Sequence, residues 1–340
     1  MSISTSLSDK KKNIFSLVPL ATKTPPVIII GLPRSGSSLL AEVASNLTDW
    51  YVFDDLYFYR KAKSLNATSE RLNDSQLIEL VSFLGGQVRA RLKYGFYCIP
   101  NIALADVDKF NEALIETFKD NLPFWHELLA EFMTRLALSQ GCSNWGFKAP
   151  QDFMNAQYYA KIFPKVKFIF LYRDPRKVLS SFKFVDKGNG DSRLYHPVFY
   201  SLYWRMAIQE LSKLQKTVPN QVLSVRYEDL VRNSDEQINF ISLFLNTTIG
   251  EVNKKIKNNS SFMNKEIKTI TPTETWLCEK IVGRYIKYCN YPENMGCFRF
   301  QDIKDLSLTT VIFIINQIKR FVFSPTARQS ILMYIKNIFP

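Results

Sequence analysis

The chain has 340 residues, of which 46% are hydrophobic and 14% aromatic, so it contains enough apolar material for one large folded domain. Its formal charge of +13 favours anionic partners, such as a phosphorylated small molecule, an acidic acceptor, an anionic membrane or a nucleic acid. The basic residues are scattered and no nucleic-acid-binding motif occurs, which argues against a nucleic-acid partner. The chain has five cysteines, an odd number without a C-x-x-C pair, which argues against a disulfide framework. It has only two histidines, which argues against a zinc site.

The first 24 residues are polar and then rich in lysine, and we expect them to form a flexible segment. They lack the apolar core of a signal peptide. Together with the cysteine pattern, this composition predicts a reducing, cytoplasmic location.

A short β-branched run leads directly into a turn that is rich in hydroxyl groups. Residues 27–30 read VIII, and residues 31–40 read GLPRSGSSLL. If a buried strand ends here and a helix begins at Gly36 or Ser37, unpaired backbone N–H groups point into the turn, where Arg34 adds a positive charge. The segment therefore predicts a phosphate-binding loop. Its glycine spacing matches the start of G-x-x-x-x-G-K-[ST], but Ser37 stands where an ATP-binding loop has lysine.

Four further runs of β-branched and aromatic residues predict strands at 50–53, 145–147, 166–172 and 222–225. Helical patterns separate them, and residues 72–138 carry no comparable strand signal. This alternation is typical of βαβ units, so we predict an α/β, P-loop-like, three-layer fold with a central parallel sheet flanked by helices. The predicted organisation is a flexible segment at 1–24, a main domain at 25–300 with a helical insertion at about 56–140, and an amphipathic helical extension at 301–340.

Capping residues and apolar spacing locate several helices. Asp174 and Pro175 suit the N-cap and first turn of a helix that continues through 180–182. Apolar residues at helical spacing predict a second helix over 197–215, a third that ends near 245, and a single helix over 271–288.

Three clusters of basic or hydroxyl side chains follow predicted strands. They are the first loop, the segment from Arg173 to Ser181, and the segment from Arg226 to Asp229. Because open α/β sheets bind ligands at the carboxyl ends of their parallel strands, we expect these clusters to meet at one edge.

These motifs resemble those of sulfotransferases that use 3′-phosphoadenosine 5′-phosphosulfate (PAPS) as donor. In that family a first loop of the form P-[RK]-S-G-[TS]-[TS]-x-L holds the 5′-phosphosulfate, and PRSGSSLL at 33–40 fits every constrained position. The family also has an arginine at a strand end and a serine eight residues later, which bind the 3′-phosphate, and Arg173 and Ser181 have this spacing. The resemblance extends over about 26–292, and the arginine in the loop is more similar to the tyrosylprotein, Golgi and bacterial branches than to the cytosolic branch.

The resemblance implies a set of donor-binding residues, which are Arg34, Ser35, Gly36, Ser37, Ser38, Arg173, Ser181 and Tyr227. Tyr227 belongs to the segment RYEDL, which also resembles a family element. Arg34 and Lys148 would stabilise the transferring sulfuryl group, with Lys148 just beyond a strand end.

The resemblance also implies a carboxylate base after the second strand, and Asp55 falls at the corresponding distance from Arg34. The family usually has glutamate or histidine there, and Asp54 stands beside it. A turn or a helix N-cap is the alternative role for these two aspartates.

The sequence thus predicts metal-independent, in-line transfer of a sulfuryl group from PAPS to a hydroxyl acceptor, leaving adenosine 3′,5′-bisphosphate (PAP). The acceptor, either a small molecule or a group on a carrier, is not specified. Two alternatives stay open: a P-loop small-molecule kinase, and a non-catalytic membrane-surface or scaffold protein.

The C-terminal extension contains an uninterrupted apolar run at 311–315 that is too short to span a bilayer. Its pattern predicts two amphipathic helices. These helices could pack on the domain, form a homodimer, or make peripheral contact with a membrane.

Overall fold

The computed structural model describes residues 25–45, 47, 49–94, 99, 101–185, 191–248, 268–324, 327–328 and 331–332. The predicted flexible segment at 1–24 lies outside them. The centre of the fold is a five-stranded sheet in the order β2-β3-β1-β4-β5, in which every neighbouring pair is parallel. Its strands are β1 (Val27–Gly31), β2 (Trp50–Phe53), β3 (Asn144–Lys148), β4 (Lys167–Tyr172) and β5 (Val222–Arg226). The predicted α/β class and all five predicted strands are confirmed.

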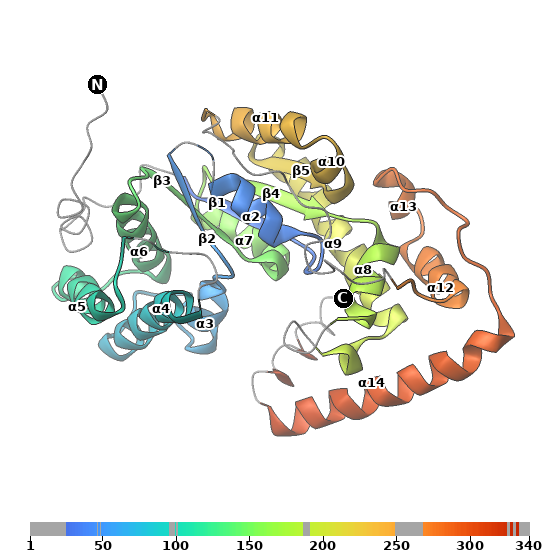
Figure 1. The fold of residues 1–340 in the computed structure, drawn as a ribbon. Helices are drawn as coiled ribbons and strands as arrows, with labels where there is room; N and C mark the ends of the chain where they lie inside the picture. The colour runs from blue at the N-terminus through green and yellow to red at the C-terminus, as the bar shows by residue number, and fades with distance from the viewer. Residues whose placement is uncertain are drawn as a thin grey trace.

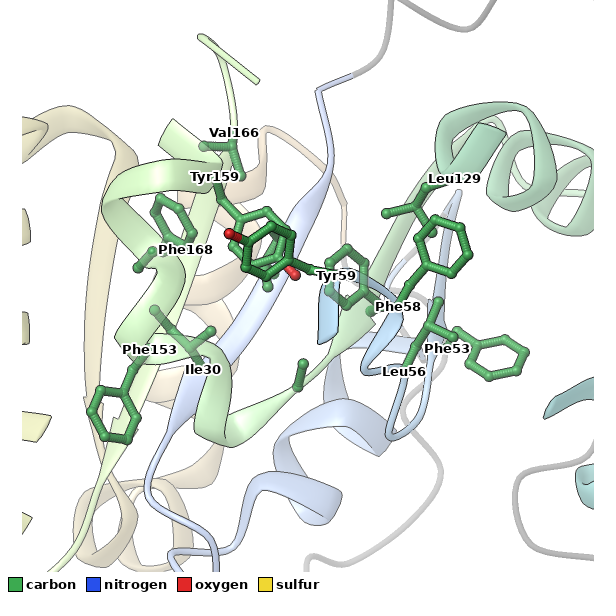
Figure 2. Packing of buried hydrophobic residues seen from close by; sticks show 14 of the residues in the cluster. Ile30, Phe53, Leu56, Phe58, Tyr59, Leu129, Phe153, Tyr159, Val166 and Phe168 are labelled. Carbon is green, nitrogen blue, oxygen red and sulfur yellow. The ribbon is translucent and has the colours of Figure 1, made fainter. Parts of the chain in front are cut away.

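Helices cover both faces of the sheet, which accounts for strands that are apolar on both sides (Figure 1). On one face, Val27 and Ile29 of β1 pack with α2 (Ser37–Ser45), α10 (Tyr227–Arg232) and α11 (Ser234–Leu245). On the other face, Ile28 and Ile30 pack with α6 (Trp125–Ser139), α7 (Ala156–Ile162) and α9 (Pro197–Thr217). Figure 2 shows part of this second cluster, with Ile30 near aromatic side chains. Together, the layers give the helix–sheet–helix arrangement.

The segment between β2 and β3 is helical in the part that the structure describes. It contains α3 (Phe58–Ser64), α4 (Asp74–Tyr94), a short 3-10 helix (Leu104–Asp106), α5 (Val107–Phe118) and α6. Figure 1 shows α3, α4 and α5 grouped beyond the β2 edge of the sheet.

The loop after β1 occupies the point where the chain changes direction across the sheet. β1 lies between β3 and β4, and the connection from β3 to β4 passes over it. The carboxyl end of β1 therefore lies between the ends of two other strands, which is where open α/β sheets form their ligand sites.

The predicted helix at 174–182 is confirmed as α8 (Pro175–Lys183), with the Asp174 side chain accepting a hydrogen bond from the backbone N–H of Arg176. The predicted single helix over 271–288 is wrong. Two helices, α12 (Pro272–Val282) and α13 (Tyr285–Tyr288), are separated at Gly283, whose φ of 53° is left-handed and ends the first helix.

The C-terminal extension contains α14 (Ile303–Phe323), and most of the second helix predicted there falls outside the described residues. Among the described residues, the stretch Phe300–Phe323 is long and apolar enough to cross a bilayer, with a mean hydropathy of 1.4 in its most apolar window. The apolar run at 311–315 lies inside this longer helical stretch, and the few polar residues that flank it do not end the helix.

Candidate functional site

The loop between β1 and α2 is a tight turn that two glycines make sterically feasible. A Cβ atom on Gly31 would lie 2.1 Å from the backbone oxygen of Leu171, and one on Gly36 would lie 2.4 Å from the ring of Tyr227. Both glycines have positive φ, and so does Arg34 at 70°. The backbone N–H of Ser35 donates to the carbonyl of Leu32 at 3.3 Å. The turn therefore fits closely against both β4 and the start of α10.

The turn has the features of an anion site. The N–H groups in the first turn of α2 have no acceptors within the helix, and they favour negative charge. Ser35 is fully buried, and its Oγ has no hydrogen-bond partner among the described residues. A buried hydroxyl without a partner is costly, and an anion in the turn would give it an acceptor.

The side chain of Arg34 reaches α8. Its Nε donates to Oγ of Ser181 at 3.1 Å, and Arg173 Nη1 donates to the Arg34 carbonyl at 3.4 Å. The Arg173 guanidinium lies over the Tyr227 ring at 4.3 Å, and the Arg173 carbonyl accepts a hydrogen bond from the indole of Trp204. Side chains from the β1 loop, the end of β4, α8 and α10 thus form one connected group.

Lys148, the last residue of β3, lies on the other side of the loop. Its Nζ donates to Oγ of Ser38 at 2.9 Å, and it lies 2.6 Å from Oδ1 of Asp54 and 3.3 Å from Oδ2 of Asp55. The Lys148 side chain is 3% exposed. A nearly buried cation therefore touches both the turn between β1 and α2 and the two aspartates after β2.

The two aspartates differ in environment although they are adjacent in sequence. The Asp54 side chain is 7% exposed and that of Asp55 is 49% exposed. Burial raises the pKa of Asp54, while the charge of Lys148 opposes the rise. Asp55 has a left-handed φ of 50°, which turns the chain so that neighbouring side chains face different surroundings.

A cavity of about 520 Å³ opens beside this group, between the ends of β4 and β5. Arg173 and Tyr227 line it and also contact the loop. The other lining residues are Asp174, Lys177, Arg226, Glu228, Val231, Arg232, Tyr291 and Pro292. Cations outnumber carboxylates in this lining, so the cavity suits an anion that also has a flat, apolar part.

All the residues that the sequence singles out lie along this edge of the sheet. Arg34, Arg173, Ser181 and Tyr227 gather on one side of the loop, and Lys148, Ser38 and Asp55 on the other. Ser35 and Ser37 are buried within the loop region. Among the described residues, no three His, Cys, Asp or Glu side chains are grouped so that they could hold a metal ion.

Arg91 of α4 is a site residue that was not predicted from the sequence. Its guanidinium donates to the carbonyls of Asp54 and Asp55 and lies 4.5 Å from the centre of the Phe53 ring. Arg226 in the cavity lining was noted only as part of a basic cluster, whereas it lies over the Tyr291 ring at 4.4 Å. A basic residue on a polar helix resembles any solvated side chain, so the sequence carries no signal for the contact made by Arg91.

One family model matches most of the chain. Residues 25–250 match the model of a family described as the sulfotransferase family. No curated protein matches the sequence.

The chain is also similar to solved structures. The sulfotransferase domain of the olefin synthase of Synechococcus PCC 7002 is 18% identical, with 87% of this chain and 98% of that chain covered and a TM-score of 0.48. The sulfotransferase domain from the curacin biosynthetic pathway is 16% identical, with 84% and 98% covered and a TM-score of 0.48. Mouse sulfotransferase SULT7A1 complexed with PAP is 12% identical, with 93% and 90% covered and a TM-score of 0.38.

Proposed function

Because this chain belongs to the sulfotransferase family, we propose that it transfers a sulfuryl group from PAPS to a hydroxyl acceptor. One observation carries the proposal: Arg34 of the loop contacts Ser181 of α8, while Lys148 of β3 contacts Ser38 of the same loop. Cations from two separate strand ends therefore converge on a turn that is built for an anion.

The donor would lie along the edge of the sheet. Its 5′-phosphosulfate would occupy the turn, within reach of Ser35, the first N–H groups of α2, Arg34 and Lys148. Its 3′-phosphate would lie between Arg173 and Ser181, which both contact Arg34. The cavity lined by Tyr227, Arg226 and Tyr291 would take the nucleoside, because its lining combines cations with aromatic faces.

The transfer step would break the bond between sulfur and the bridging phosphate oxygen and form a bond between sulfur and the acceptor oxygen. PAP leaves with the electron pair of the broken bond, and the proton of the acceptor hydroxyl passes to a carboxylate. Negative charge accumulates on the bridging oxygen in a loose transition state, so fixed cations stabilise it strongly. Arg34 and Lys148 supply those cations.

Asp55 is better suited than Asp54 to accept the proton. Its side chain is half exposed and lies 3.3 Å from Lys148, so an acceptor arriving from solvent can approach it. Asp54 is nearly buried and lies closer to the same ammonium group. We therefore assign proton abstraction to Asp55 and charge compensation of Lys148 to Asp54.

Binding of the reaction product tests the first part of the proposal. PAP at saturating concentration should raise the melting temperature of the purified chain. Two separate controls, adenosine alone and ATP with Mg²⁺, should raise it less. Incubation with radiolabelled PAPS and pools of alcohols, phenols, sugars and peptides should then yield a labelled product. No stabilisation by PAP would reject PAPS as the donor, and Mg²⁺-dependent turnover of ATP would instead favour a kinase.

A further inference from the structure

Helix α14 has an apolar face that no part of the described chain covers. Figure 1 shows the helix extending along one side of the molecule, beyond α8 and α12. None of its most apolar window is buried. Six of its exposed apolar side chains, each between 46% and 60% exposed, are Leu308, Val311, Ile314, Ile315, Ile318 and Val322.

These six residues form a single stripe. At 100° per residue they fall within an arc of about 120°, following the spacing i, i+3, i+4 and i+7. Lys304 continues the stripe into the first turn of the helix, and Lys319 borders it near the end. We refer to these six apolar residues as the α14 stripe.

The opposite face of α14 contacts the domain near the middle of the helix. Thr310 Oγ1 lies 3.1 Å from Nε2 of His196, and the Phe313 ring packs 5.6 Å from that of Phe199. Just before the helix, the side chain of Asp302 accepts a hydrogen bond from the backbone N–H of Thr273 at 3.0 Å. A helix held in this way at its start and middle presents the stripe outward.

Charge and aromatic residues around the stripe indicate what covers it. The only acidic residue of α14 is Asp305, which lies outside the arc, whereas both charged residues at the stripe are lysines. A second copy of the stripe would therefore offer these lysines no counter-charge, but anionic lipid headgroups would. Phe300 and Phe323, both 81% exposed, stand at the two ends of this helical stretch, where aromatic side chains favour the boundary between headgroups and acyl chains.

We propose that α14 lies flat on a membrane that contains anionic lipid, with the α14 stripe inserted among the acyl chains near the surface. Lys304 and Lys319 then extend along the apolar boundary to the headgroups. The overall charge of +13 adds a long-range attraction to such a surface. This inference does not depend on the sulfotransferase activity.

Flotation of the full chain with phosphatidylcholine vesicles, with and without about 30% phosphatidylserine, tests the proposal. The chain should float with the anionic vesicles and much less with the neutral ones. Ile314→Glu/Ile318→Glu should reduce partitioning about tenfold or more, because two charges would enter the apolar layer. Phe240→Glu/Leu243→Glu makes the same change at exposed apolar positions of α11 and should bind as the unmodified chain does.

Lys304→Glu/Lys319→Glu provides a second variant with an intact stripe, and it should lose the preference for phosphatidylserine. Melting curves check that all variants are folded. Equal flotation of the unmodified chain and the stripe variant would overturn the proposal. So would a dimer in lipid-free buffer that Ile314→Glu/Ile318→Glu dissociates, since a second copy would then cover the stripe. Resistance of the bound chain to alkaline carbonate would also overturn it, in favour of a spanning helix.

Discussion

Nζ of Lys148 lies 2.6 Å from Oδ1 of Asp54, and both side chains are more than nine-tenths buried. Burial raises the pKa of Asp54 even though the ammonium group opposes the rise. Lys148 therefore offsets part of the cost of burying the Asp54 carboxyl group, and it is held where the end of β3 meets the first loop.

Lys148→Met should impair both stability and turnover. Removing one partner of a buried ion pair typically costs about 3 kcal/mol or more of unfolding free energy near neutral pH. This loss of unfolding free energy should become smaller as the pH falls toward 3.8, the ordinary pKa of Asp54, because a protonated carboxyl group needs no neighbouring cation. Turnover should fall about 10²- to 10³-fold. Urea unfolding at several pH values and single-turnover kinetics measure the two effects, and an undiminished rate would remove Lys148 from the reaction.

The two neighbouring aspartates should respond differently to the same substitution. Asp55→Asn should lower kcat about 10²-fold, because it removes the proposed base. The affinity for PAP should stay within about twofold, since Asp55 contacts only Lys148 among the proposed donor-binding side chains. Asp54→Asn is the matched control and should lower kcat much less. If Asp54→Asn instead caused the larger loss of kcat, the two roles would be exchanged.

The proposed 3′-phosphate site should be separable from the proposed reacting centre. Arg173→Ala should weaken PAP binding about 10- to 100-fold, and Ser181→Ala about fivefold, as expected for losing a charged and a neutral hydrogen bond. Titration calorimetry with PAP gives both values. Asp55→Ala serves as the comparison and should change the affinity for PAP little. If it weakened PAP binding as much as Arg173→Ala does, the placement of the 3′-phosphate at Arg173 and of the reacting group near Asp55 would be contradicted.

Gly31 should tolerate no side chain. Gly31→Ala would place Cβ 2.1 Å from the Leu171 carbonyl oxygen at a φ of 138°, so we expect it to lower the free energy of unfolding by about 2 kcal/mol or more. Gly86 in α4 has nothing within 4 Å of an added Cβ, and Gly86→Ala should stabilise the chain by about 0.5–1 kcal/mol. Urea unfolding of both variants measures the two changes in unfolding free energy. Changes of the same sign and similar size would refute the expected contrast between the two glycines.

His196, against which α14 packs, should make stability depend on pH. Burial lowers its pKa below 6.5, so the neutral ring contributes stability that is complete above pH 6.5 and is lost as the pH falls through the folded-state pKa. The free energy of unfolding should therefore decrease on acidification below 6.5, and His196→Gln should show a smaller decrease over the same range. If plots of unfolding free energy against pH were parallel for the unmodified chain and His196→Gln, the His196 ring would not be the source of the pH dependence.

The strands could be predicted from the sequence because their signal is local. The run at 27–30 contains only β-branched residues and is bounded by Gly31, and the structure has its strand there. The order of strands could not be predicted in the same way, because it depends on pairing between residues such as Val27 and Gly146, which are far apart in sequence. Similarly, the break between α12 and α13 depends on one glycine inside a region with a continuous helical pattern.

The sequence located the candidate site better than it distinguished the groups within it. Arg34, Arg173 and Ser181 could be assigned to one place because each follows a strand or its loop. Asp54 and Asp55 carry identical functional groups, and only the left-handed turn at Asp55 and the packing around them separate a buried from an exposed carboxylate. Arg91 of α4 donates to the carbonyls of Asp54 and Asp55, which precede α3. Because these residues are far apart in the sequence, no local sequence pattern predicts the contact.

Arg34 has the φ of 70° that glycine or asparagine would adopt with less strain. A residue better suited to this backbone would make the loop more stable and would also remove its guanidinium group. Screening random variants for heat resistance alone should therefore enrich substitutions at Arg34 that leave the chain folded but inactive. Any effort to stabilise this protein by directed evolution would need to select for turnover at the same time.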